Sequence, residues 1–185
     1  MTLIFASRLS GKTIVILIGE DEHRFVVEKD RICVKSKFIR AACASDRWLE
    51  GRDMVVRLPE VRSRTLFKRY QSWIRTDTVT VKETTSETAE ERNMKVPIRL
   101  HLLGDFLDDV RLRNVTIRAL TKYGACPSIK HRNFIFEQTT PASPLIKWTV
   151  ETIVNLAHQY KSEAVSVLYD KDLALQIATI LMRRR

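Results

Sequence analysis

Residues 13–45 read TIVILIGEDEHRFVVEKDRICVKSKFIRAACAS, and this stretch decides the fold. The apolar, β-branched run Thr13–Ile18 predicts a strand, the polar residues 19–22 predict a tight turn, and Phe25–Val27 predicts a second strand. From Lys29 onward the pattern changes to intervals of three and four residues, which are typical of helices. The positions that carry this pattern are Ile32, Cys33, Ser36, Ile39 and Cys43. The sequence therefore predicts a β-hairpin followed by two helices.

Short strands and helices continue beyond this stretch. We expect strands at Met54–Leu58 and Thr78–Val81, and a pair of helices around residues 100–120. A helix between the two strands is predicted from apolar residues at helical spacing: Phe67, Tyr70, Trp73 and Ile74. Residues 82–95 have low hydrophobicity and predict an exposed, mobile loop. The expected fold class is α/β in the α+β sense, with a small mixed sheet flanked by a cluster of helices.

The last sixty residues are predicted to form a linker and a helical extension. The proline-containing residues 125–144 indicate a linker, and Ser143 is a good N-cap for a helix with Pro144 at its first position. Two apolar stripes follow, one at Ile146, Val150, Ile153, Ala157 and Tyr160 with Trp148 beside it, and one at Leu173, Ile177, Ile180 and Leu181. Each helix has one apolar face, so we expect both to pack on the preceding domain or on each other. The predicted division is 1–124 for the α/β domain, 125–144 for the linker and 145–185 for the extension.

Cysteine usage and the N-terminal sequence indicate a protein of the cytoplasm, the nucleus or both. The three cysteines cannot all pair and form no Cys-x-x-Cys motif, so we expect free thiols in a reducing compartment. Residues 1–12 have too short an apolar stretch to span a membrane and lack a basic segment before it. We therefore expect neither a signal peptide nor a membrane anchor.

Motifs for catalysis, cofactors and metals are weak. Residues 10–13, SGKT, resemble the end of a phosphate-binding loop, but Ala6 stands where that motif needs glycine and a strand follows instead of a helix. The four histidines are scattered and have no metal-ligand spacing. Asp105, Asp108 and Asp109 are interpreted as solvated carboxylates between two helices, one of them at a cap position. We expect no enzyme, and no catalytic, cofactor-binding or metal-binding residues.

The formal net charge of +10 raises the alternative of a nucleic-acid-binding protein. Basic residues such as Arg64, Lys68 and Arg75 lie on helix faces opposite apolar ones, as in a solvated amphipathic surface. No zinc finger or aromatic-interleaved basic groove accompanies them. We therefore expect no specific nucleic-acid binding. The alternative that stays open is a basic nuclear protein with nonspecific nucleic-acid binding, or a transcription-related scaffold.

Two segments resemble a known family. Residues 28–41, EKDRICVKSKFIRA, match the pattern His-basic-x-x-Leu-Ala-x-x-Ser-x-x-Phe-Arg-Ala at Lys29, Ile32, Ser36 and Arg40-Ala41, although Glu28 replaces the histidine. Residues 102–114, LLGDFLDDVRLRN, also fit. The chain thus resembles BTB/POZ domain proteins, especially the short fungal ones that consist of this domain and a helical tail.

This resemblance implies a non-catalytic protein–protein interaction module that forms a homodimer. The apolar residues ahead of the first strand, which would otherwise form an exposed patch, are the predicted homotypic interface: Leu3, Ile4, Phe5 and Leu9. The resemblance also implies an adaptor role in a ubiquitin ligase complex that contains Cullin-3. The predicted partner surface consists of Trp73, Asp77, Val81 and Glu83. Arg75-Thr76-Asp77 departs from the Tyr-Ser/Thr-Gly that many family members have there.

Overall fold

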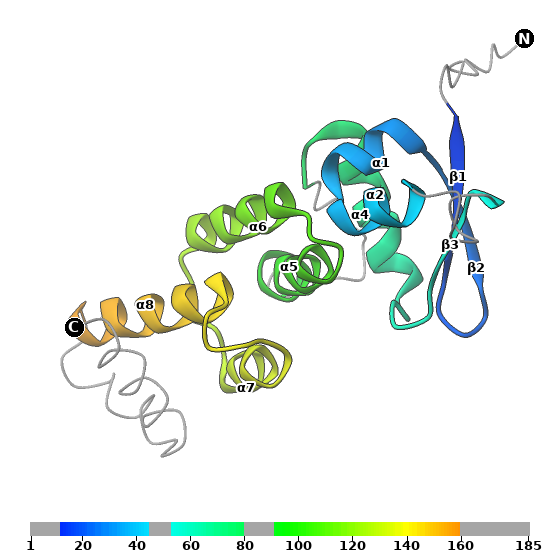
Figure 1. The fold of residues 1–185 in the computed structure, drawn as a ribbon. Helices are drawn as coiled ribbons and strands as arrows, with labels where there is room; N and C mark the ends of the chain where they lie inside the picture. The colour runs from blue at the N-terminus through cyan, green and yellow to red at the C-terminus, as the bar shows by residue number, and fades with distance from the viewer. Residues whose placement is uncertain (1–11, 45–52, 80–90, 160–185) are drawn as a thin grey trace, which may run out of the picture. The chain divides into compact units, whose positions relative to one another are not determined.

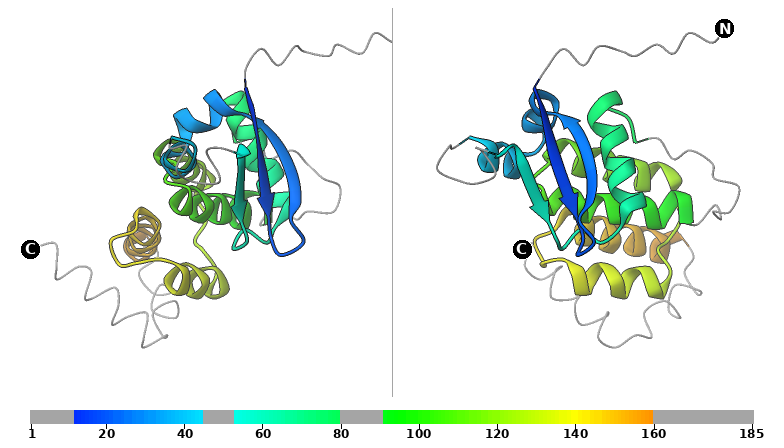
Figure 2. Two further views of the ribbon diagram at one scale, coloured as in Figure 1. Left: turned by 45° about the vertical axis from the view of Figure 1, so that its right-hand side comes forward. Right: turned by 90° about the vertical axis from the view of Figure 1, so that its right-hand side faces the viewer.

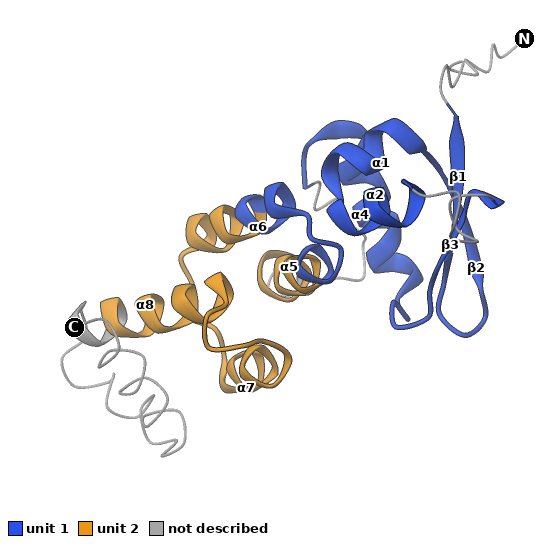
Figure 3. Ribbon diagram, in the orientation of Figure 1, with its two compact units in different colours: residues 1–82, 103–115 blue, residues 83–102, 116–185 orange. Residues whose placement is uncertain are grey.

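The structure is a computed structural model that describes residues 12–44, 53–79 and 91–159 (Figure 1). The chain divides into two compact units, coloured separately in Figure 3. Unit 1 comprises Met1–Lys82 and Leu103–Val115, and unit 2 comprises Glu83–Leu102 and Thr116–Arg185. The units are interleaved along the chain, whereas the predicted division is serial. Local sequence patterns do not show that one helix can contribute residues to two units.

Unit 1 contains a small mixed sheet with the strand order β2-β1-β3. Strands β1 (Thr13–Ile18) and β2 (His23–Glu28) are antiparallel, and β3 (Val55–Leu58) runs parallel to β1 on its other side. The turn between β1 and β2 begins at Gly19, whose φ of 68° favours glycine. The predicted hairpin, the third strand and the α+β class are therefore confirmed.

One face of this sheet forms part of the apolar core. Ile16 is 0% exposed and lies opposite Phe25 on β2 and Val56 on β3. Helix α4 (Arg64–Thr76) packs on this face, where the ring centroid of Phe67 is 4.7 Å from that of Phe25. Full burial of an apolar side chain such as that of Ile16 or Phe67 stabilises the fold by about 1.5–3 kcal/mol. The register is fixed because a slip of one residue would turn Ile16 away from the core.

The two predicted helices after the hairpin are confirmed as α1 (Lys29–Lys35) and α2 (Lys37–Cys43). Ser36 separates them because its backbone is extended, with φ −100° and ψ 114°. Ile32, Ser36, Ile39 and Cys43 are buried, as the spacing predicts, whereas Cys33 is half-buried. Helices α1, α2 and α4 lie on the same side of the sheet (Figures 1 and 2).

Helices α5 (Val96–Phe106) and α6 (Val110–Tyr123) confirm the predicted helix pair. A short π-helix, η1 (Glu91–Lys95), precedes α5. Its Met94 is 2% exposed, so the end of the predicted exposed loop at residues 82–95 is packed instead. Met94 is an apolar residue within this polar stretch, and its side chain is part of the core of unit 2.

Unit 2 is built from α7 (Ile129–Gln138), α8 (Pro144–Gln159) and parts of η1, α5 and α6. Helix α8 starts as predicted, with the Ser143 hydroxyl accepting a hydrogen bond from the Leu145 N–H at 3.3 Å. The core combines residues of all these helices: Met94, Ile98, Leu120, Ile135, Leu145, Ile146, Trp148, Val150 and Ile153. The predicted packing of Ile146, Trp148, Val150 and Ile153 is confirmed.

Two further predictions differ from the structure, and others lie outside the described residues. The predicted linker 125–144 contains helix α7, which sequence reasoning missed because three of its apolar residues, 134–136, are consecutive and lack helical spacing. Thr78 and Val79 are not in a strand, because Asp77 ends α4 in the left-handed conformation, with φ 55°. Residues 80–81, Ala157, Tyr160 and the predicted final helix lie outside the described residues or side chains. None of the helices in the described part of the chain combines the length and apolar character needed to cross a bilayer.

Helix α7 offers a matched test of the unit 2 core. Ile135 is 0% exposed, whereas Ile129 on the same helix is 58% exposed. We predict that Ile135→Ala lowers the free energy of unfolding by about 2–5 kcal/mol, because it leaves a cavity. Ile129→Ala is the control and changes it by less than about 0.5 kcal/mol. Urea unfolding followed by circular dichroism measures both, and equal effects would show that α7 is not part of the core.

Candidate functional site at the corner of α2, α5 and α6

A buried serine joins the α1–α2 junction to the connection between α5 and α6. The Ser36 hydroxyl donates a hydrogen bond to the Leu107 carbonyl at 2.6 Å and accepts one from the Ile39 N–H at 3.0 Å. The same oxygen thus caps α2 and holds a residue 71 positions later in the chain. Two longer backbone contacts support it, from the Phe38 N–H to the Leu107 carbonyl at 3.4 Å and from the Lys37 N–H to the Asp108 carbonyl at 3.5 Å.

The carboxylate of Asp109 is the centre of this corner and is 0% exposed. Its Oδ2 accepts hydrogen bonds from Trp73 Nε1 at 2.9 Å and from the Tyr70 hydroxyl at 3.4 Å. Its Oδ1 accepts one from the Leu112 N–H at 2.9 Å, which makes Asp109 the N-cap of α6. The predicted cap is confirmed, but the interpretation of Asp109 as solvated is wrong. The donors Tyr70 and Trp73 belong to α4, far from Asp109 in the sequence, so patterns among neighbouring residues do not reveal that Asp109 is buried.

Tyr70 donates one of these bonds from the core and stays protonated. Burial raises the pKa of its hydroxyl well above the ordinary value, and the Asp109 carboxylate raises it further. The phenol is therefore a hydrogen-bond donor at all physiological pH values. Tyr70 and Trp73, one turn apart on α4, present two neutral donors to one carboxylate.

Two of the residues predicted to bind a partner, Trp73 and Asp77, lie in one cluster with Lys35. Trp73 is 2% exposed, so its ring is part of the core. The Lys35 ammonium lies 4.1 Å from the centroid of that ring and forms an ion pair with Asp77. Lys35 is the first cause of the lowered pKa of the Asp77 carboxyl, through its hydrogen bond. The Asp77 carboxylate is therefore exposed to solvent and also paired with Lys35. It is not the independent surface carboxylate that the sequence indicates.

A close backbone approach shapes the same corner. A Cβ atom added at Gly104 would meet side-chain carbons of Leu112 and Arg113 at 3.3 Å and the Asp109 carbonyl at 3.4 Å. The Asp109 N–H donates to the Gly104 carbonyl at 2.7 Å. Glycine therefore permits the tight connection from α5 to α6.

This framework exposes an apolar surface, which we call the corner patch and define as Phe38 and Phe106. Each of the two is 41% exposed. The rings of Phe38 and Phe106 are in contact, with centroids 5.6 Å apart. Charged pairs border the patch, Lys37 with Asp108 at 3.4 Å and Arg113 with Asp105 at 2.6 Å. An apolar centre with a charged rim is typical of protein interaction sites.

Two of the described cysteines, Cys33 and Cys126, are not activated nucleophiles. Burial, with a further contribution from Cys43, raises the pKa of Cys33 to about 11. Burial also raises the pKa of Cys126. Both thiols are therefore protonated at neutral pH, and the reactive form of a cysteine is the thiolate.

Within residues 12–44, 53–79 and 91–159, no group of three or more His, Cys, Asp or Glu side chains is placed to hold a metal ion.

The remaining predicted site residues lie outside the described residues: Leu3, Ile4, Phe5, Leu9, Val81 and Glu83. Sequence reasoning missed the corner patch. One signal was present for Phe38, because Ile39 and Cys43 form the buried stripe of α2 and Phe38 lies off that stripe. No protein-family model matches the sequence, and no curated protein matches it significantly. The relation to BTB/POZ domains is therefore a prediction that rests on the residues quoted above.

The buried carboxylate gives a first prediction for this corner. Asp109→Asn replaces one acceptor oxygen by a donor group that faces other donors, so we expect a loss of about 1–3 kcal/mol in the free energy of unfolding. The control is Asp21→Asn, in the turn between β1 and β2, where the side chain is 86% exposed. Urea unfolding compares the two variants with the natural chain. Equal stability of all three would contradict the central role of Asp109.

The Lys35–Asp77 pair predicts a pH dependence. The folded-state pKa of Asp77 is lowered, so its ionised form stabilises the fold above about pH 3.9, the ordinary value. That contribution is lost as pH falls through the lower folded-state pKa. We expect Asp77→Asn to melt below the natural chain at pH 7 and the difference to shrink below about pH 3.9. Calorimetry from pH 7 to pH 3 measures the difference in melting temperature between Asp77→Asn and the natural chain, with Asp21→Asn as control. A difference that stays constant with pH would show that the ion pair is not its source.

Proposed function

We propose that this chain is a non-catalytic protein-interaction module of the BTB/POZ type that associates with a second copy of itself. The order of strands, helices and sheet in unit 1 is compatible with the small mixed sheet and helix cluster that the resemblance implies. The observation that carries the proposal is the corner patch. Aromatic side chains that are held rigidly and half exposed are frequent centres of binding energy.

The charges around the patch favour a second copy as the partner. Lys37 and Arg113 supply positive charge, and Asp105 and Asp108 supply negative charge, within a few residues of the two rings. A twofold interface brings the same surface together twice, so a rim with both signs is complementary to itself. The rings would be desolvated at the centre while each acidic group faces a basic group of the other copy.

The proposed interface is tested by sedimentation velocity. We predict that the natural chain is a dimer and that Phe38→Ser with Phe106→Ser raises its Kd about 30-fold or more, since hot-spot residues contribute about 2 kcal/mol or more. Tyr123→Ser is the matched control, because Tyr123 is an exposed aromatic side chain outside the patch, at 36% exposure. Its dimer should be unchanged.

A monomeric natural chain would overturn the proposed self-association. A dimer that survives the double change would move the interface to the predicted N-terminal residues 3–9, which deletion of residues 1–10 then tests. Circular dichroism must show that each variant is folded.

We propose Cullin-3 as a second partner on the resemblance alone. Because Trp73 is buried, the residue of the predicted partner surface that the structure describes as exposed is Asp77. A pull-down with Cullin-3 compares the natural chain with the variant that carries Phe38→Ser and Phe106→Ser. No capture of the natural chain would end the ligase-adaptor proposal without affecting self-association.

A further inference from the structure

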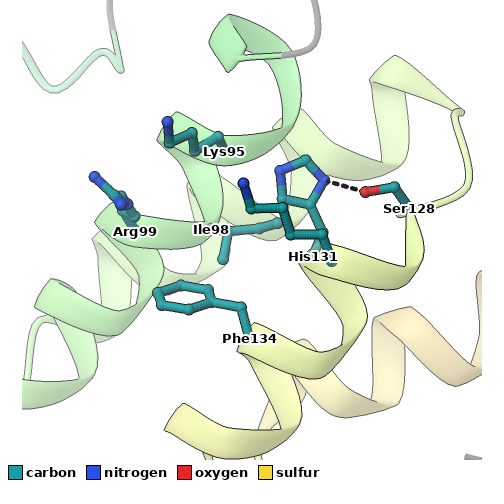
Figure 4. Close-up of a pocket in the computed structure, with 7 residues that line it drawn as sticks. Lys95, Ile98, Arg99, Ser128, His131 and Phe134 are labelled. Carbon is teal, nitrogen blue, oxygen red and sulfur yellow. Dashed lines mark hydrogen bonds between the residues drawn. The ribbon is translucent and has the colours of Figure 1, made fainter.

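Unit 2 contains a pocket of about 280 Å³ that the proposed self-association does not use (Figure 4). One wall comes from η1 and α5 and carries Lys95, Ile98 and Arg99. The other comes from the start of α7 and carries Ser128, Lys130, His131 and Phe134. Figure 4 shows these two groups of side chains facing each other. The pocket thus joins an element predicted as a loop to one predicted as a linker.

The charge of the pocket has one sign. Lys95, Arg99 and Lys130 are cationic, and no Asp or Glu lines the pocket. In the part of the chain that the structure describes, neither Arg99 nor Lys130 makes an ion pair with a carboxylate. Arg99 and Lys130 repel each other without a counter-charge between them, and an anion in the pocket would relieve that repulsion. Three cations suit a ligand with two negative charges better than one with a single charge.

The start of α7 provides polar groups on the same side. Ser128 is the N-cap residue, but its side chain makes no capping hydrogen bond. Its hydroxyl instead bonds Nδ1 of His131 at 3.1 Å, which orients the imidazole within the pocket wall. The first-turn N–H groups of a helix have no intrahelical acceptor and add positive potential. These N–H groups add to the positive potential of the three cationic side chains.

The remaining lining is apolar. Ile98 is 1% exposed and belongs to the unit 2 core, and the half-buried Phe134 packs against that core. Phe134 lines the same pocket as the three cationic residues. A site for a simple inorganic anion has no need of an aromatic wall, whereas an aromatic side chain favours a planar group.

We propose that this pocket binds a phosphate monoester that carries a planar ring, with the phosphate at Lys95, Arg99 and Lys130 and the ring against Phe134. A phosphate monoester has a charge of about −1.5 to −2 at pH 7, and the guanidinium of Arg99 matches two of its oxygens. A free nucleotide and a phosphotyrosine side chain of another protein both supply this chemistry.

Isothermal titration of the full chain at about 150 mM salt, where surface attraction is screened, tests the proposal. The probes are phenyl phosphate, phenol and inorganic phosphate. We expect phenyl phosphate to bind at least tenfold more tightly than either fragment. Adenosine monophosphate and a phosphotyrosine peptide are then compared, and tighter binding of either one supports the pocket and identifies the source of the ligand.

Three variants locate the binding. Arg99→Gln with Lys130→Gln should weaken phenyl phosphate at least tenfold, and the fold should persist because both side chains are exposed. The matched control removes two charges elsewhere in unit 2, Arg118→Gln with Lys122→Gln, and should have no effect. Phe134→Leu should abolish the preference for phenyl phosphate over inorganic phosphate.

Three results would overturn the proposal. The first is that phenyl phosphate does not bind. The second is that the control pair loses as much affinity for phenyl phosphate as Arg99→Gln with Lys130→Gln, which indicates general attraction of anions to a basic protein. The third is that Phe134→Leu keeps the preference for phenyl phosphate over inorganic phosphate.

Discussion

The structure of unit 1 depends on one buried carboxylate. Asp109 accepts hydrogen bonds from an indole, a phenol and the first turn of α6, and so connects α4 to the connection between α5 and α6. A buried charge is costly unless donors surround it, and this requirement leaves few arrangements of the three helices. Ser36 adds the fourth element, because its hydroxyl links α2 to the same connection.

The rigidity of that corner explains why an apolar surface can be exposed there. Phe38 and Phe106 come from segments far apart in the sequence, and the bonds of Ser36 and Asp109 bring their helices together. Side chains that are ordered before binding lose less entropy on association. The same bonds that stabilise the fold thus prepare the surface that we propose for self-association.

Unit 2 uses the basic composition differently. The net charge of +10 indicates attraction to polyanions in general. The structure gathers three of these cations in one pocket with an aromatic wall, where we propose that shape and charge together select a ligand. The distribution of charge in space is therefore more informative here than its total.

The sequence by itself determined the local elements. The apolar, β-branched run Thr13–Ile18, the spacing of Ile32 and Ile39 and the Ser143-Pro144 start of α8 are set by interactions within a few residues, and the structure has the strands and helices that they predict. Only the tertiary structure decided the burial of Trp73 and Asp109, the pairing of Lys35 with Asp77, the helix α7 and the two candidate binding surfaces. The physical reason is that burial, charge pairing and surface patches depend on contacts between segments tens of residues apart, whereas periodicity and capping depend only on neighbours along the chain.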